Sequence, residues 1–265
     1  MTASGEALFA REGEGFRPSP LARGPWSASA LHGGPVAALL ARLAEGLPQP
    51  VPMHPARATV ELLRPVPLAP LRGEARILRP GRKVQLTEST LFAGDVEVAR
   101  ATLLWIRREA QPLPEDHGGG RAAPPPPPTG AAATPPRWVT DAPAYHSHAV
   151  EHRVVRGSWG GLGPCTDWIR LRVPVVAGET PTPLQRVAAA ADFGNGISAA
   201  LPFGAWRFIN PDLTIHLERL PAGAWVCLDA VTWLAGEGVG VAESALFDER
   251  GRLGRAQQSL LLEKA

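Results

Sequence analysis

Cysteine is scarce in this chain, and the sequence also lacks the signals that mark exported, membrane-bound and metal-binding proteins. The two cysteines, Cys165 and Cys227, lie far apart, without a CxxC pair and without histidines at metal-ligand spacing. This usage favours reduced core thiols over a disulfide framework or a zinc site. No stretch approaches the roughly 20 apolar residues of a membrane span, and residues 1–15 lack the apolar segment of a secretory signal. We therefore expect a cytoplasmic protein without a membrane span, a metal or another cofactor.

The chain also has no large excess of charge of one sign. It has 27 lysines and arginines and 25 aspartates and glutamates, which gives a net charge of +2. No basic run is interleaved with aromatic residues, so we expect no nucleic-acid partner. The chain has no G-x-S-x-G motif, which excludes the nucleophile turn of an α/β-hydrolase. The glycines of GEGVG at 236–240 come without the lysine of a phosphate-binding loop, so a nucleotide site is not expected.

Proline, by contrast, is plentiful, and nine of its 29 residues lie between positions 111 and 137. This segment contains GGGRAAPPPPPTGAAATPP, which has almost no large apolar side chains and favours an extended polyproline conformation. We interpret 111–137 as a linker between an N-terminal domain, residues 1–110, and a C-terminal domain, residues 138–265.

The two halves are related by an internal repeat. The run Glu88-Ser-Thr-Leu-Phe92 matches Glu243-Ser-Ala-Leu-Phe247, and the same spacing of 155 residues pairs Arg100-Ala101 with Arg255-Ala256. The register holds without a gap over more than forty positions, from the pair Thr59 and Thr214 onward. A period of this length is too long for a solenoid, so it indicates duplication of a whole domain.

Each half predicts one helix followed by four strands. Proline near the start and glycine at the end delimit apolar, alanine-rich helices at 33–46 and 182–194. Runs rich in Val, Leu, Ile and Thr between turn residues predict the strands: 57–64, 71–79, 83–92 and 96–107, then 213–219, 225–233, 238–247 and 252–263. Two more runs, 149–155 and 168–176, precede the second helix. The pattern predicts an α+β fold in which an antiparallel sheet packs on an apolar helix.

This arrangement resembles the hotdog fold, and two copies in one chain resemble the double-hotdog acyl-CoA thioesterases of the thioesterase II type. The resemblance rests on LHGGPVAALLAR, VELLRPVPL, ILRPGRKVQL, AADFGNG, FINPDLTIHLERLPAGAW and GRAQQSLLL, taken in order. It implies an acyl-CoA substrate, a homo-oligomer, and a catalytic aspartate, threonine and glutamine that fall on Asp192, Asn210 and Gln258. Asparagine at 210 departs from the family's threonine, and a shorter turn before the last strand leaves Gln257 and Ser259 as competitors for Gln258.

Strand alternation distinguishes the two glutamines, because residues two apart share a face. Gln258 lies on the face of Ala256 and Leu260, whose counterparts in the first copy are apolar, whereas Gln257 lies on the opposite face. Gln258 therefore places an amide in the interior where the first copy has Leu103. An unpaired interior amide costs about 1–3 kcal/mol, so Gln258 is either a hydrogen-bonded structural residue or part of a site.

Asp192 is a charged residue near the end of an alanine-rich helix, where the helix dipole disfavours a negative charge. Aligning the two helices places it opposite Ala44, so it is either a helix-terminating turn residue or a site residue. Thioester hydrolysis needs an acceptor for a water proton and donors for an oxyanion. His32, Gly33 and Gly34 open the first helix and are candidates for binding substrate or the oxyanion, although Gly-Gly is also ordinary turn chemistry.

Three functions are compatible with these residues. The first is an acyl-CoA thioesterase that hydrolyses fatty or related acyl-CoA thioesters by direct attack of a water held by Asp192 and Gln258. The second is a hotdog enoyl-CoA hydratase or dehydratase, an enzyme type that relies on an Asp–His pair, and no histidine adjoins Asp192 in the sequence. The third is a non-catalytic acyl-binding protein.

Overall fold

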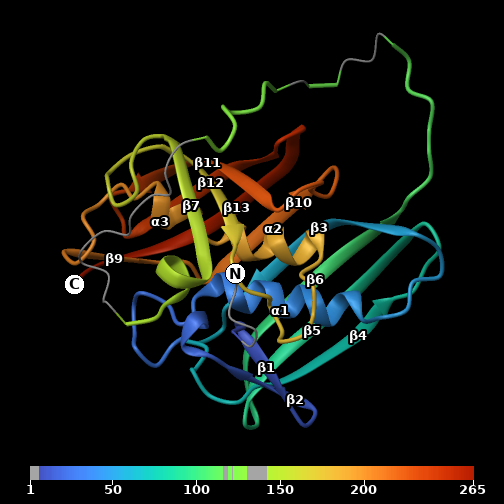
Figure 1. Ribbon diagram of the computed structural model, residues 1–265, viewed down its shortest axis with the longest axis horizontal. Helices are drawn as coiled ribbons and strands as arrows, with labels where there is room; N and C mark the ends of the chain where they lie inside the picture. The colour runs from blue at the N-terminus through green and yellow to red at the C-terminus, as the bar shows by residue number, and fades with distance from the viewer. Residues whose placement is uncertain (1–5, 116–118, 121, 130–141) are drawn as a thin grey trace.

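The structure is a computed structural model that describes residues 6–115, 119–120, 122–129 and 142–265. Its main feature is one long antiparallel sheet of eleven strands with two helices side by side on it (Figure 1). The first half of the chain contributes, from the edge inward, β4 (Arg72–Arg79), β5 (Val84–Ala93), β6 (Val96–Arg107) and β3 (Met53–Glu61). The second half continues with β10 (Asp212–Leu217), β13 (Gly251–Lys264), β12 (Val239–Asp248), β11 (Trp225–Ala235), β8 (Cys165–Leu171) and β7 (Val150–Arg156). The eleventh strand, β9 (Trp206–Ile209), pairs with the end of β13.

The duplication predicted from the repeat appears as an approximate two-fold relation across the middle of the sheet. Strands β3 and β10 pair antiparallel there, with Thr59 opposite its own counterpart Thr214. Glu88 pairs with Thr102 in the first half, and Glu243 pairs with Gln257 in the second. Because these four residues keep the 155-residue spacing, the repeated strands occupy equivalent places in two hotdog domains.

Helices α1 (Gly33–Glu45) and α2 (Pro183–Ala191) confirm the two predicted helices. Most of their buried side chains are small or aliphatic, including Val36, Leu39, Leu40 and Val187, and these pack into one core with the inner face of the sheet. The helices run antiparallel. The start of α1 therefore meets the end of α2, and the end of α1 meets the start of α2, where Glu45 accepts hydrogen bonds from Thr182 and Gln185.

Several short elements escaped the sequence patterns. These are β1 (Phe9–Glu12), β2 (Gly15–Pro18), β9 (Trp206–Ile209), the 3-10 helix Pro20–Ala22, the π-helix Tyr145–Ala149 and α3 (Gly194–Ile197). The strand expected at 168–176 is instead β8, at Cys165–Leu171. The apolar residues after it belong to an extended segment, in which Pro174 and Val175 accept hydrogen bonds from the N–H groups of Leu8 and Phe9. Proline lacks the N–H that a ladder needs, so the strand ends before Pro174.

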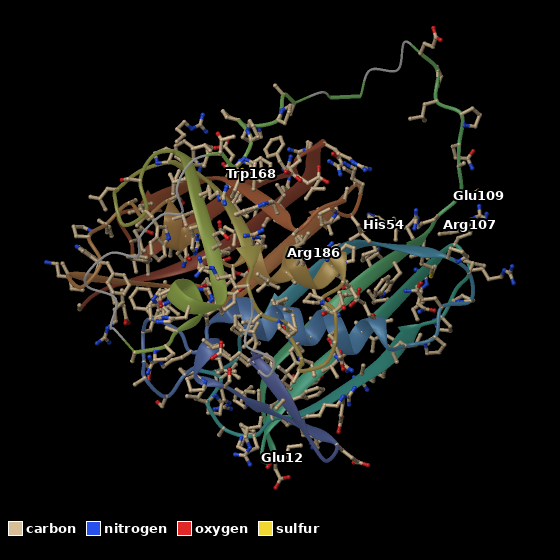
Figure 2. All side chains as sticks on the ribbon, in the orientation of Figure 1. Glu12, His54, Arg107, Glu109, Trp168 and Arg186 are labelled. Atoms are coloured by element: carbon tan, nitrogen blue, oxygen red, sulfur yellow. The ribbon has the colours of Figure 1, made fainter. Side chains whose placement is uncertain are left out.

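Part of the predicted linker lies on the outer face of the second domain. The described residues between 111 and 129 contain no helix or strand. In Figure 2 the chain runs away from the body of the molecule after Glu109 and returns on the side where Trp168 lies. The Trp168 indole N–H donates to the carbonyl of Pro126, and Arg153 donates to that of Pro128. Residues 130–137 and the start of the predicted second domain, 138–141, lie outside the described residues, so the linker and its boundaries stay a prediction.

Both cysteines are buried and unpaired. Burial raises the pKa of the Cys165 thiol to about 12, so it stays protonated at neutral pH. No helix in the described part of the chain is long and apolar enough to cross a membrane.

Candidate active site

A cavity of about 830 Å³ opens where the two hotdog domains meet. This volume is within the range of small-molecule sites. Its wall takes residues from the start of α1 and the segment after β3 in the first domain, and from the end of α2, from α3 and from β9 in the second. Most of the lining is apolar, and the polar groups that reach it include His32, His146, Asp192 and Asn210.

The Asp192 carboxylate is the centre of a hydrogen-bond network that joins three elements. Asp192 is 5% exposed and terminates α2. Its Oδ1 accepts from Asn210 Nδ2 at 2.8 Å and from Gln258 Nε2 at 3.1 Å. Its Oδ2 lies 2.9 Å from His32 Nδ1. The structure therefore brings together Asp192, Asn210, Gln258 and His32, which are separated in the sequence by up to 226 positions, from 32 to 258.

Gln258 donates a hydrogen bond to the Asp192 carboxylate but does not itself line the cavity. It is 1% exposed, whereas Gln257 and Ser259 are exposed on the opposite face of β13, as the alternation predicts. Its amide nitrogen also donates to the Asp192 carbonyl at 3.2 Å, and its Oε1 accepts from the Asn195 N–H at 3.0 Å. Both ends of the amide are thus engaged, and Gln258 contacts Asp192 directly where a shared water was expected.

The start of α1 corrects the expectation that the Asp192 charge is electrostatically misplaced. The carboxylate lies at the unfavourable end of α2 but also against the first turn of α1, whose N-terminal end is positive. Gly33 permits this approach: a Cβ there would lie 2.6 Å from Asp192 Oδ2. A Cβ on Gly34 would lie 2.6 Å from the Ala189 carbonyl oxygen. Both glycines lie within α1, and the close contact between the helices, not a turn, is the reason for them.

His32 caps α1 and also faces Asp192. Its Nδ1 lies 3.1 Å from the Gly34 N–H and 2.9 Å from Asp192 Oδ2, so one nitrogen serves two neighbours. When Nδ1 is protonated it donates to Asp192, and when it is unprotonated it accepts from Gly34. The ring packs against Tyr145 and Phe193, with centroids 5.0 and 4.8 Å away.

The pseudo-symmetry creates a second helix junction, which has a carboxylate of its own but not the same set of partners. There the Glu45 carboxylate accepts from Thr182 Oγ1 at 2.7 Å and from Gln185 Nε2 at 2.8 Å. Burial raises the pKa of Glu45, although these hydrogen bonds oppose the rise. The residue equivalent to Gln258 is Leu103, which is fully buried. Glu45 and Gln185 thus form a second carboxylate–amide contact, but neither of them lines the cavity, whereas Asp192 does.

Sequence reasoning missed three residues around this centre. Asn195 binds both Gln258 and Asn210, the latter at 3.4 Å through its side chain. Tyr145 closes one side and donates its hydroxyl to the Ala189 carbonyl at 2.8 Å. Burial, reinforced by Asp192, raises the pKa of Tyr145 well above its ordinary value. His146 lies on the cavity wall. Only Asn195, within AADFGNG, lay in a motif that the sequence singled out. Among the described residues, no group of three or more His, Cys, Asp or Glu side chains is placed to hold a metal.

The fold and the site define a double-hotdog protein in which a carboxylate with two amide partners lines a cavity between the copies. Comparison with protein families gives the same result for both halves. The acyl-CoA thioesterase N-terminal domain matches residues 22–106, and the acyl-CoA thioesterase C-terminal domain matches residues 96–262. The chain therefore belongs to the acyl-CoA thioesterase family, a family of thioester hydrolases.

Solved structures share this architecture at low sequence identity. Acyl-CoA thioesterase II TesB2 from Mycobacterium marinum is 16% identical, with a TM-score of 0.64, and the match covers 98% of this chain and 94% of that chain. The tesB protein of Mycobacterium avium subspecies paratuberculosis is 16% identical, with a TM-score of 0.62 and coverage of 96% and 95%. A hot dog fold protein from Alicyclobacillus acidocaldarius is 18% identical, with a TM-score of 0.70 and coverage of 97% and 96%. No curated protein matches the chain.

Proposed function

We propose that this protein hydrolyses acyl-CoA thioesters by direct attack of a water molecule that Asp192 deprotonates. The observation that carries the proposal is the position of the Asp192 carboxylate. Asp192 is buried and lines the cavity, and its Oδ1 accepts hydrogen bonds from Asn210 and Gln258. Oδ1 accepts two hydrogen bonds, whereas Oδ2 faces only His32 Nδ1, so Oδ2 has a lone pair left to accept the proton of the water. Asn210, also on the cavity wall, supplies a second polar group for the water. Gln258 positions the carboxylate.

The reaction is balanced by these groups alone. The water oxygen attacks the thioester carbon while its proton passes to Asp192, which gives a tetrahedral oxyanion. The oxyanion collapses, the C–S bond breaks, and the CoA thiolate takes up the proton. The Gly33 N–H points from the start of α1 and makes no hydrogen bond with the described part of the protein, so it supports an oxyanion site. When His32 Nδ1 carries a proton it donates to Asp192 and no longer accepts from the Gly34 N–H. The Gly34 N–H is then a second donor for the oxyanion.

Two arginines support CoA as the carrier of the acyl group. Arg64 and Arg207 are exposed and line the cavity, and neither has an acidic partner among the described residues. In the second domain, the equivalent of Arg64 is Arg219, which pairs with Asp248 at 2.5 Å. The equivalent of Asp248 in the first domain is Ala93, which leaves the Arg64 charge available. Unpaired guanidinium groups at a cavity suit the phosphates of CoA.

Thiol release from a panel of acyl-CoA thioesters of increasing chain length tests this function. We expect release of free CoA together with an equal amount of the free acid. The absence of CoA release from every member of the panel, with a folded protein, would overturn the proposal. Arg64→Gln and Arg207→Gln should raise KM for acyl-CoA while leaving hydrolysis of a short pantetheine thioester, which lacks the nucleotide phosphates, unchanged.

One observation favours the hydratase as a second candidate. The histidine that the sequence near Asp192 lacks is supplied by the other domain, since His32 Nδ1 lies 2.9 Å from Asp192 Oδ2. An Asp–His pair can deliver a water and a proton to an enoyl thioester. Incubation with an enoyl-CoA separates the two reactions: hydration gives a hydroxyacyl-CoA with no free thiol, and hydrolysis gives free CoA.

A homo-oligomer and a cytoplasmic location stay predictions. Exposed apolar side chains on the outer face of the second domain, including Trp233, Val239, Val241 and Leu261, support self-association. Light scattering coupled to size-exclusion chromatography measures the oligomeric state.

A further inference from the structure

His32 has features that its role as a helix cap does not require. It is the N-cap of α1, yet histidine is not among the residues that favour this position, which are serine, threonine, aspartate, asparagine and glycine. It also lines the cavity, with 11% of its side chain exposed, and its Nδ1 lies 2.9 Å from Asp192 Oδ2. The cap alone therefore does not account for a histidine at this position.

The second helix junction shows what the cap itself needs. There the N-cap of α2 is Thr182, whose Oγ1 accepts from the Gln185 N–H at 3.2 Å and donates to the Glu45 carboxylate at 2.7 Å. At both junctions, the N-cap residue of one helix thus contacts the carboxylate at the end of the other helix. Threonine is enough for both contacts. The histidine at position 32 adds a second ring nitrogen, which can give up or take up a proton.

This second nitrogen of His32, Nε2, is open to the cavity. It has no hydrogen-bond partner in the described part of the chain, but it is not one of the unpartnered side-chain atoms that are shielded from solvent. Both ring nitrogens of His146, by contrast, are shielded. When the Gly34 N–H donates to His32 Nδ1, at 3.1 Å, a neutral ring carries its proton on Nε2. This tautomer presents an N–H donor to the cavity.

The other titratable side chains on the described cavity wall are less suited to give a proton to a leaving group. Arg64 and Arg207 line the cavity, but a guanidinium group does not lose its proton in a protein. Asp192 accepts a proton in the proposed hydrolysis, and the nitrogens of His146 are shielded. The accessible N–H of His32 is therefore the proton donor that this wall offers.

We propose that His32 is the general acid of the reaction and that its Nε2 proton goes to the sulfur of the departing CoA. The inference rests on the proposed function and deepens it, because it names the source of the proton that the thiolate takes up. A donor placed at the leaving group lowers the barrier to breaking the bond.

The protons balance over one turnover. The attacking water gives its proton to Asp192 Oδ2, which lies 2.9 Å from His32 Nδ1. As the C–S bond breaks, the Nε2 proton passes to sulfur and Nδ1 takes the proton from Oδ2. Asp192 is then a carboxylate again, and the neutral ring holds its proton on Nδ1. The first tautomer returns when water in the emptied cavity gives a proton to Nε2 and receives the Nδ1 proton through Asp192.

A change of leaving group tests the assignment. An aryl thiol is more acidic than the alkyl thiol of CoA, so its thiolate leaves faster and has less need of a proton donor. His32→Thr installs the cap of the other junction and removes the ring. It should lower kcat/KM for octanoyl-CoA at least about tenfold more than kcat/KM for the 4-nitrothiophenyl thioester of octanoic acid, since general acid catalysis contributes roughly 10²–10⁴-fold.

Two further variants are measured on the same pair of thioesters. Asp192→Asn should slow both alike, because both need the attacking water. Thr182→Ala is the matched control: it removes the N-cap of α2, which does not line the cavity, so it should lower the Tm and leave the ratio of the two rates unchanged.

An equal loss on both thioesters in His32→Thr would overturn the assignment, because His32 would then act on the water or on the fold. Wild-type rates on both would overturn it as well. If His32→Thr does not fold, His32→Asn takes its place, since asparagine is a strong cap. If the aryl thioester is not hydrolysed, added imidazole should restore octanoyl-CoA hydrolysis by the variant, and no rescue would overturn the assignment. If the wild type hydrolyses no thioester, the proposed function itself fails, whereas an equal loss in His32→Thr removes only the role of His32.

Discussion

Replacing Gln258 by leucine separates a positioning role from a structural one, because the first domain already carries Leu103 at the equivalent place. The substitution removes the Nε2 donor 3.1 Å from Asp192 Oδ1, and it leaves the Asn195 N–H without its acceptor at 3.0 Å. A hydrogen bond to a charged group contributes about 1.5–3 kcal/mol. Loss of this bond should therefore lower kcat by roughly 10- to 150-fold. The KM should change little, since Gln258 does not line the cavity.

The same change should also lower the stability of the protein. An unpaired buried N–H costs about 1–3 kcal/mol, which for a chain of this size lowers the Tm by about 2–12 °C. Steady-state thiol release and thermal denaturation of the same preparation measure both effects. Leu103→Ala is the matched control: it should cost about 2–5 kcal/mol of stability by leaving a cavity while kcat stays near the wild-type value.

Three results would refute this reasoning. If Gln258→Leu hydrolyses acyl-CoA at the wild-type rate, the bond to Asp192 has no part in catalysis. If it unfolds the protein, or if Leu103→Ala lowers kcat equally, Gln258 is a structural core residue.

Two further predictions concern close packing and charge. Gly33→Ala should lower kcat at least about 100-fold, because its Cβ would lie 2.6 Å from Asp192 Oδ2 and displace the carboxylate. The control is Gly236→Ala, where a Cβ meets nothing within 4 Å, and its kinetics should be unchanged. Equal losses in both variants would contradict the packing argument. Burial alone would raise the pKa of Asp248, but hydrogen bonds from Arg219, Ala222 and Arg250 lower it from 3.8 to about 2. The folded pKa is depressed, so this stability is full above pH about 4 and is lost as pH falls through about 2. Arg219→Gln should flatten that part of the stability profile measured by urea denaturation, and an unchanged profile would show that Arg219 does not hold the pKa down.

Local patterns in the sequence were enough to predict the repeated core. Proline and glycine mark the ends of α1 and α2 to within a few residues, and the 155-residue repeat predicts which strands are equivalent. The alternation on β13 correctly placed Gln258 inside and Gln257 outside. These features depend on neighbours one to four residues away or on the chain's own second copy, so they are visible without tertiary structure.

The contacts around Asp192 could not be predicted in this way. His32 reaches Asp192 only because the two helices pack antiparallel, and the compensating positive end of α1 comes from the other domain. Asn195 binds Gln258 because α2 ends at Ala191 and the chain then turns into α3. The alanine-rich sequence does not indicate this break in the helix. Tyr145 and His146 belong to a π-helix that follows the proline-rich segment, with no periodic pattern of its own.

The rate of acyl-CoA hydrolysis by Asp192→Asn tests the central claim most directly. The variant keeps the shape, and its amide oxygen can still accept from Asn210 and Gln258 while its NH2 faces His32 Nδ1. The proton acceptor alone is lost, so kcat should fall by roughly 10²–10⁴-fold with little change in Tm. Hydrolysis by the purified variant at nearly the wild-type rate would contradict the assignment of Asp192 as the group that deprotonates the attacking water.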